Sequence, residues 1–370
     1  MRTIVKYASL LLASAVMLLS CEKTGGENVN MDAGFHIMSD KNVIQSNGED
    51  IATLSAYLDG KDVTAETVFY LKEGNSKKQL SGNILTVDKV GKYNIIAMYG
   101  TFITNDPISV TAIDVAIPAV AEDADVSNTS FVHRAFLNQY TGTGCIFCPG
   151  MVYVLRETFE DEVVKSKCVL SAIHSYGVGD PAYITSPTVQ SYPYLILDMS
   201  KGFTYDMGAE ILKEYIKEST SSAAKVGISA NPVLTDDVLV VTVEVKAAQA
   251  GEYNVGVWFM QDDVFGQQEI WEKFPQSMRT DKTLNYHDNC VRSADSRNSN
   301  AFFGFPLGKI EAGKTAQRSF VLNIDKDNWK LSEISDLHFA AFVTEKAGKS
   351  YEVVNVIDCP IDQPSPYQYQ

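Results

Sequence analysis

The segment Cys145-Ile146-Phe147-Cys148-Pro149 constrains the fold of this chain more than any other part of its sequence. The two cysteines follow an apolar run, Phe131 to Leu137, and precede a stretch with a helical pattern. A thiol at the start of a helix lies near unpaired N–H groups and near the positive end of the helix dipole. These groups stabilise its thiolate and lower its pKa below the free value of about 8.5. Because only two residues separate the cysteines, the second sulfur can close a disulfide with the first.

The stretch after the second cysteine predicts a helix with one apolar face, because apolar residues recur at spacings of three and four. These residues are Val152, Leu155, Phe159 and Val163. Pro149 fits the first turn, where its ring removes no intrahelical hydrogen bond. An apolar strand, a glycine turn, two spaced cysteines and a helix, in this order, are typical of a redox site.

Together with a later segment, this order resembles the thioredoxin-like proteins. The later segment, Ser191 to Gly202, matches the place where thioredoxins open a strand with a cis-proline and close a hairpin with Lys-Gly. The resemblance covers roughly residues 131–222 and implies that Pro193 is cis and lies against the cysteine pair. It also implies thiol–disulfide exchange, in which Cys145 attacks, Cys148 resolves the mixed disulfide and Pro193 docks the partner's backbone.

Two alternatives for the cysteine pair stay open. Gly144 stands where thioredoxins carry a Trp, and Gln139 replaces their buried Asp and cannot move a proton. The pair could therefore be a structural disulfide on a thioredoxin-like scaffold. It could also bind zinc together with Cys168 and His174, although the sequence has no second Cys-x-x-Cys. We interpret His174 as a surface histidine of the loop after a strand rather than as a group that tunes the thiolate.

The start of the chain has the features of an export signal. Arg2 and Lys6 precede an apolar stretch that is too short to span a membrane comfortably. The sequence Leu-Leu-Ser-Cys that ends at Cys21 resembles the lipobox of bacterial lipoproteins, which implies cleavage before Cys21 and lipid on its sulfur and amine. We expect a signal peptide over residues 1–20, a tether over residues 21–31, and a lipid anchor in the outer membrane that faces the periplasm or the cell surface. An ordinary signal peptide with an incidental cysteine is the alternative.

The charge and the cysteine content of the chain limit its expected partners and the compartment in which it folds. The formal net charge is −15 and no run of Lys or Arg occurs, so nucleic-acid binding is not expected. Six cysteines in an exported chain fit an oxidising compartment. Cys168 begins an apolar strand and is expected to be a buried free thiol, whereas Cys290 and Cys359 could form a disulfide. We expect no cofactor and no metal, and partners that are either exported thiol or disulfide proteins or ligands at the cell surface.

The chain after the tether is predicted to be a multidomain α+β protein. Residues 32–117 contain several short strands separated by turns, which is typical of an immunoglobulin-like β-sandwich. Residues 118–128 read as a solvated acidic linker, and residues 129–222 as the thioredoxin-like α/β domain. Residues 223–362 show strands without alternating helices and predict an antiparallel β-sandwich, followed by a tail over residues 363–370.

A polar segment in the last domain completes a further resemblance. Its sequence is Tyr286-His287-Asp288-Asn289-Cys290-Val291-Arg292. With the lipoprotein signal, Thr141-Gly142-x-x-Cys145-x-x-Cys148-Pro149 and the Pro193 hairpin, this order resembles the outer membrane protein 28 family of bacterial surface lipoproteins. The biochemical role of that family is poorly defined, and adhesion has been proposed for it. We interpret His287, Asp288 and Arg292 as an interdomain hydrogen-bond cluster rather than as catalytic residues.

The sequence thus supports two functions. The first is thiol–disulfide exchange on exported proteins, which would make the chain a thiol–disulfide oxidoreductase with Cys145, Cys148 and Pro193 at its site. The second is a surface binding or adhesion lipoprotein in which the cysteine pair is a structural disulfide. Exchange requires the sulfur atoms to be within reach of a partner and close to residue 193, so the position and burial of the pair distinguish the two hypotheses.

Overall fold

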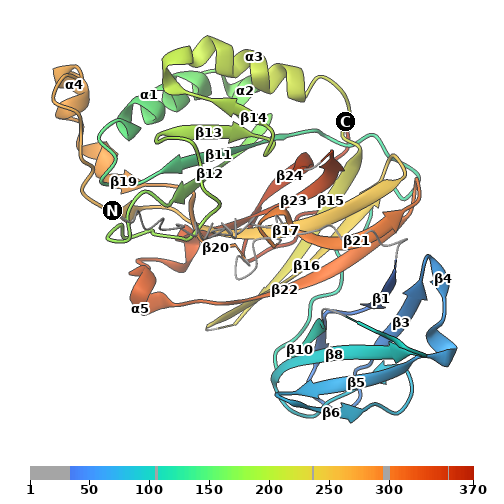
Figure 1. Cartoon of the computed structure of the whole chain (residues 1–370). Coiled ribbons are helices and arrows are strands. Elements are labelled where there is room, and N and C mark those ends of the chain that lie inside the picture. The colour runs from blue at the N-terminus through green and yellow to red at the C-terminus, as the bar shows by residue number, and fades with distance from the viewer. Residues whose placement is uncertain (1–33, 105–106, 236, 295–300, 349) are drawn as a thin grey trace, which may run out of the picture.

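A computed structural model describes residues 34–104, 107–235, 237–294, 301–348 and 350–370 (Figure 1). The predicted signal peptide, the predicted lipidation site Cys21 and the predicted tether lie outside these residues. The described chain is mostly β-sheet arranged in several sheets, in agreement with the strand patterns of the sequence. Within these ranges, no helix is long and apolar enough to cross a membrane.

Residues 35–113 form two sheets that share one apolar core. The first sheet contains β1 (Phe35–Ser39), β3 (Ala52–Leu58), β4 (Lys61–Asp62) and β7 (Ile84–Leu85). The second contains β2 (Val43–Gln45), β5 (Val68–Glu73), β6 (Ser76–Gln79), β8 (Gly91–Tyr99), β9 (Phe102–Ile103) and β10 (Ile108–Ile113). In β3, Ala52, Leu54 and Ala56 are buried and the residues between them are not, because side chains of a strand alternate between its two faces.

A nine-stranded sheet forms the centre of the rest of the chain. Its strands are β11 (Ala135–Thr141), β12 (Cys168–His174), β13 (Tyr194–Leu197), β14 (Lys201–Phe203), β17 (Gly251–Gln261), β20 (Cys290–Ala294), β21 (Phe305–Ile310), β23 (Leu337–Ala347) and β24 (Ser350–Pro360). β12 joins β20 through the parallel pairing of Ala172 with Cys290. The sheet is therefore continuous across the domain boundary that the sequence predicts near residue 222.

Helices α1 (Cys148–Phe159), α2 (Glu162–Lys165) and α3 (Ala209–Ser219) cover one face of this sheet at its β11 to β14 end (Figure 1). Every residue of β11 is buried, because these helices pack on one of its faces and side chains of β17 and β23 on the other. The predicted helix ends earlier than expected, at Phe159. Asp161 then caps α2 by accepting hydrogen bonds from the N–H groups of Val163 and Val164, and the Val163 side chain is 65% exposed instead of buried.

A three-stranded sheet packs against β17, β23 and β24 and connects them to the first domain. It contains β15 (Val226–Leu234), β16 (Val238–Ala247) and β22 (Thr315–Asn323). Val240 points away from the shared core and contacts Val43 and Ile113 of the first domain. The Asn42 side chain also donates to the carbonyl of Ser319 and accepts from its N–H group. These contacts hold the first domain, blue to cyan in Figure 1, against the three-stranded sheet.

The acidic linker predicted to be solvated is instead bonded to the folded chain. The Lys246 side chain is 1% exposed, and its Nζ atom lies 2.8 Å from Asp123 and donates to the carbonyls of Asp125 and Val126. The hydroxyl of Tyr369, next to the C-terminus, donates to Asp123 at 2.6 Å. A buried ammonium needs such partners, because an unpaired charge in a protein interior costs several kcal/mol. The linker and the C-terminal tail are therefore structural parts of the protein.

The insertion between β17 and β20, residues 262–289, leaves the sheet and reaches the cysteine pair. It contains β18 (Val264–Phe265), α4 (Gln276–Arg279) and β19 (Tyr286–His287), and β18 pairs with β19. Elsewhere the chain forms α5 (Lys326–Trp329) and short 3-10 helices over Thr64–Glu66, Tyr205–Met207, Lys282–Asn285, Ala301–Phe303 and Ile334–Asp336. The insertion brings a part of the predicted last domain to the predicted redox site.

Candidate functional site

Cys145 and Cys148 form a disulfide at the start of α1. Their Sγ atoms are 2.10 Å apart and their Cα atoms 5.4 Å apart. Cys145 is 2% exposed and Cys148 is 0% exposed, so the bond is buried. The peptide bond before Pro193 is cis, as predicted, and the strand after it pairs with β11 so that Tyr194 lies opposite Tyr140. This pairing places Pro193 beside the end of β11, from which the chain enters the cysteine motif.

The cysteine loop, residues 142–148, is a series of tight turns. The carbonyl of Gly142 accepts a hydrogen bond from the N–H of Cys145 at 3.0 Å, and the carbonyl of Cys145 accepts from the N–H of Cys148 at 3.1 Å. Position 142 requires glycine, because a Cβ atom there would lie 2.7 Å from the Cβ of Tyr176. The loop after β12 therefore packs directly on the backbone of the cysteine loop.

A covering segment, residues 266–271 of the insertion, lies on the cysteine loop. The buried Gln268 side chain donates from Nε2 to the carbonyls of Thr143 and Cys145, both at 3.0 Å. Backbone N–H groups of Glu269 and Trp271 donate to the carbonyls of Thr143 and Ile146 at 2.8 and 2.9 Å. The sequence pattern did not indicate this role for Gln268, because its partners are backbone groups more than a hundred residues away.

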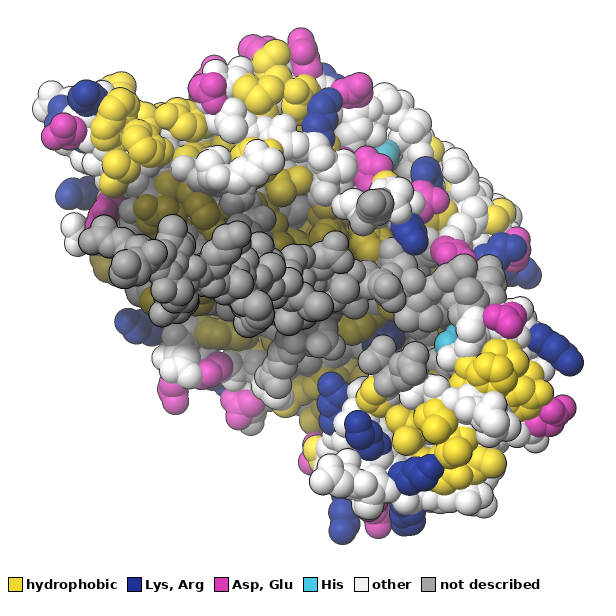
Figure 2. All heavy atoms as spheres, in the orientation of Figure 1, with side chains coloured by type: hydrophobic (Ala, Val, Ile, Leu, Met, Phe, Trp, Pro, Cys, Tyr) yellow, Lys and Arg dark blue, Asp and Glu magenta, His cyan; other side chains and the backbone are white. Residues whose placement is uncertain are grey.

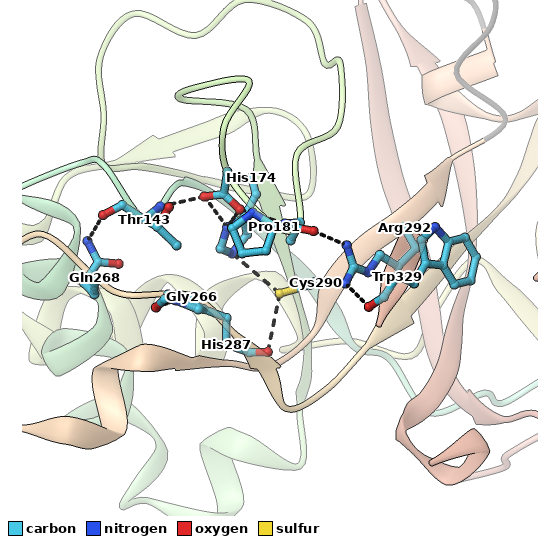
Figure 3. Close-up of polar contacts among 11 residues, drawn as sticks. Thr143, His174, Pro181, Gly266, Gln268, His287, Cys290, Arg292 and Trp329 are labelled. Carbon is cyan, nitrogen blue, oxygen red and sulfur yellow. Dashed lines mark hydrogen bonds and ion pairs between the residues drawn. The ribbon is translucent and has the colours of Figure 1, made fainter. Parts of the chain in front are cut away.

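A second group of side chains, the polar cluster, lies on the other side of Thr143 (Figure 3). Its members are His174, Asp180, His287, Cys290 and Arg292. His174, at the end of β12, is 1% exposed, and its Nδ1 atom lies 2.9 and 3.0 Å from the two carboxylate oxygens of Asp180. Asp180 also accepts from the N–H groups of Thr143 at 2.6 Å and Ala182 at 2.8 Å. The prediction that His174 is a surface histidine is wrong, because the loop that carries Asp180 folds back over it.

Charges within the polar cluster set the protonation of both histidines. Burial lowers the pKa of His174, but the sulfur of Cys290 and the carboxylate of Asp180 outweigh it and raise the pKa to about 10. Burial also opposes ionisation of Asp180, whose pKa nevertheless falls because His174 and two backbone N–H groups bind its carboxylate. Burial and the nearby His174 lower the pKa of His287 to about 4. At neutral pH the cluster thus contains a charged His174 and a neutral His287.

The remaining contacts attach the cluster to the insertion and to β20. The Sγ atom of Cys290 lies 3.6 Å from Nε2 of His174 and 3.4 Å from the carbonyl oxygen of His287. The rings of the two histidines meet edge to face, with centroids 5.0 Å apart. Arg292 donates to the carbonyls of Pro181 at 2.7 Å and Trp329 at 3.1 Å. The interpretation of this segment as a hydrogen-bond cluster therefore agrees with the contacts of Arg292, which join segments distant in sequence.

Two other predictions about cysteines are corrected. Cys290 and Cys359 do not form a disulfide, and both are free thiols. They belong to different buried clusters: Cys359 packs in the core between β17, β23 and the three-stranded sheet, whereas Cys290 packs against Ala182 and Val264. The alternative zinc site also does not form, because Cys145 and Cys148 bind each other and the Cys168 thiol donates to the carbonyl of Val164. Cys168 itself is free, as predicted, but only partly buried.

Similarity to known proteins is limited to fold. No protein-family model and no curated protein matches the chain. Among solved structures, HBP35 of Porphyromonas gingivalis is similar with a TM-score of 0.50 and 14% identity, over 62% of this chain and 76% of that chain. A β-glucosidase from Kluyveromyces marxianus matches with a TM-score of 0.18 and 12% identity, over 86% of this chain and 45% of that chain, which is too low a score to support an argument.

Proposed function

We propose that this chain is a lipid-anchored cell-surface protein that binds other molecules, and that its Cys145–Cys148 disulfide is structural. The observation that carries the proposal is the burial of both cysteines, which are 2% and 0% exposed. Thiol–disulfide exchange needs a thiolate to approach one sulfur of the bond directly. Residues of the covering segment, above all Gln268, bind the loop that holds the pair, and a partner would have to displace them first.

The order of the elements supports a thioredoxin-like scaffold without exchange activity. A strand, the cysteine pair, a helix, a parallel strand, a cis-proline hairpin and a further helix follow one another from β11 to α3. Gln139 is buried on β11, where thioredoxins carry an acidic residue that moves protons. We propose membership of the outer membrane protein 28 family on the same order of motifs, and attachment through Cys21 on the lipobox-like sequence before it.

The first domain supplies surface for binding. Five of its large hydrophobic side chains are exposed: Ile51, Ile84, Val90, Phe102 and Ile103. Figure 2 shows apolar side chains gathered on this domain, at the lower right of the view. A contiguous apolar patch on a protein surface is a feature of sites that recognise partners.

Two measurements test the proposal. With dithiothreitol as the source of electrons, the purified protein should accelerate the reduction of insulin no more than the Cys145→Ser variant does, because neither can carry out exchange. Protease treatment of intact cells should remove the folded domains, since we place them outside the cell. Insulin reduction that is lost in Cys145→Ser would replace the proposal with the oxidoreductase hypothesis.

A further inference from the structure

Three side chains of the polar cluster form an ordered series of carboxylate, imidazole and sulfur. Asp180 binds Nδ1 of His174 at 2.9 Å, and Nε2 of the same ring lies 3.6 Å from Sγ of Cys290. They come from different segments: the end of β12, the loop after it and the start of β20. A nucleophile next to a base whose other nitrogen is held by a third group is the arrangement that activates cysteine and serine in enzymes.

We propose that Cys290 is a thiolate paired with the His174 imidazolium, and that hydrogen peroxide or another small hydroperoxide oxidises it. The sulfur attacks one peroxide oxygen, and the O–O bond breaks. The attacked oxygen stays on the sulfur with its hydrogen, which makes a sulfenic acid. The departing hydroxide, or the alkoxide of an organic hydroperoxide, takes the proton of the His174 imidazolium and leaves as water or as the alcohol. The sulfur loses two electrons, and the peroxide gains them.

The surroundings of Cys290 restrict the oxidant to a small molecule. Cys290 is 0% exposed and packs against Ala182 and Val264. Ala182 belongs to the loop 175–192, which is described throughout and forms neither helix nor strand apart from an isolated bridge at Tyr183. Access to the sulfur requires this loop to move, and a peroxide requires a smaller movement than a protein thiol or disulfide does.

Charged and polar groups surround the sulfur of Cys290. Two positive groups face it, His174 and Arg292, while the His287 ring is neutral and Asp180 lies behind His174. One contact favours the neutral thiol, because the carbonyl oxygen of His287 lies 3.4 Å from the sulfur and can accept a hydrogen bond from an S–H group. The two states differ in reactivity, because only the thiolate is a strong nucleophile.

The structure places no second free thiol beside Cys290 among the cysteines that it describes. Cys168 lies four residues before Ala172, the strand partner of Cys290, which corresponds to about 13 Å along the strand. Cys359 packs in a different buried cluster from Cys290, and Cys145 and Cys148 are bonded to each other. A sulfenic acid at Cys290 therefore has no neighbouring thiol with which to condense, and it should persist long enough to be trapped.

Trapping with dimedone tests the proposal on the folded, disulfide-containing protein. The folded protein is treated with hydrogen peroxide, the peroxide is removed, and the protein is then unfolded in dimedone so that the label reaches every sulfenic acid. Mass spectrometry of peptides should find Cys290 oxidised at least about tenfold faster than Cys359 or Cys168, at a rate that changes little between about pH 6 and 8. The pKa of each of these two comparison thiols is raised to about 12, mainly by burial. The proposal is overturned if Cys290 is oxidised no faster than Cys359, or if it is oxidised only when peroxide is added in denaturant.

Variants separate the role of His174 from a general effect on folding. His174→Gln should lower the oxidation rate of Cys290 to that of Cys359 and Cys168. The control His338→Gln removes a different histidine, which is bound to Asp358 at 2.7 Å, and it should leave the oxidation rate of Cys290 unchanged. If His174→Gln fails to fold, the ultraviolet absorbance of thiolate decides instead. The native protein at neutral pH should show one thiolate that is absent from a Cys290→Ala variant and lost in denaturant, and absence of that signal contradicts the proposal.

Discussion

The disulfide and the polar cluster are two buried sites that share one residue, Thr143, and are stabilised by different forces. The N–H of Thr143 donates to Asp180 of the cluster, and its carbonyl accepts from Gln268 over the disulfide (Figure 3). Contacts of the covering segment with the cysteine loop are neutral hydrogen bonds to backbone groups. Those of the cluster join charged side chains. The two sites should therefore respond differently to substitution and to pH, although both are buried.

Removal of the Asp180 carboxylate should have the largest effect on the free energy of unfolding. Asp180→Ala removes the carboxylate partner of the buried His174 ring and leaves two backbone N–H groups without an acceptor. We expect the free energy of unfolding to fall by about 3–5 kcal/mol, measured by urea denaturation. The matched control Asp206→Ala changes an exposed aspartate and should alter it by less than about 0.5 kcal/mol. A loss below about 1 kcal/mol for Asp180→Ala would show that the ion pair does not hold the cluster together.

Substitution of Gln268 should have a smaller effect that is specific to the disulfide. Gln268→Ala removes the donor to the carbonyls of Thr143 and Cys145, so we expect about 1–2 kcal/mol of destabilisation and faster reduction of the disulfide by dithiothreitol. Gln267→Ala is the matched control, because Gln267 is the neighbouring residue and its side chain is exposed. Equal reduction rates in the two variants would mean that the covering segment does not protect the bond.

Alkaline pH should weaken the cluster and leave the disulfide site unaffected. The pKa of His174 in the folded protein is raised to about 10, above the unfolded value of about 6.5. The charged ring therefore contributes fully to the free energy of unfolding below about pH 6.5, and this contribution disappears as the pH rises through 10. Burial opposes a charged His338, but its two aspartate partners raise its pKa to about 9, so it contributes in the same direction. We expect the free energy of unfolding to fall by more than about 1 kcal/mol across this range, and by clearly less in His174→Gln. An identical fall in that variant would assign the pH dependence to His338.

The sequence predicted the local features well, because they depend on residues close together in the chain. The start of α1, the cis-proline at position 193 and the strand-rich regions follow from cysteine spacing, turn residues and apolar alternation. The polar cluster could not be predicted, since it depends on Asp180 in an irregular loop and on Cys290 in a strand that is paired across the presumed domain boundary. The burial of the disulfide likewise depends on Gln268, whose backbone partners have no signature in the sequence.

The reduction potential of the Cys145–Cys148 couple tests the central claim most directly. It can be measured by trapping thiols of the folded protein after equilibration in a series of redox buffers. If the buried disulfide is structural, its potential lies below about −300 mV, and the glutathione pool does not reduce it. A potential between about −270 and −120 mV, the range of thiol–disulfide oxidoreductases, would contradict this account and identify the pair as redox-active.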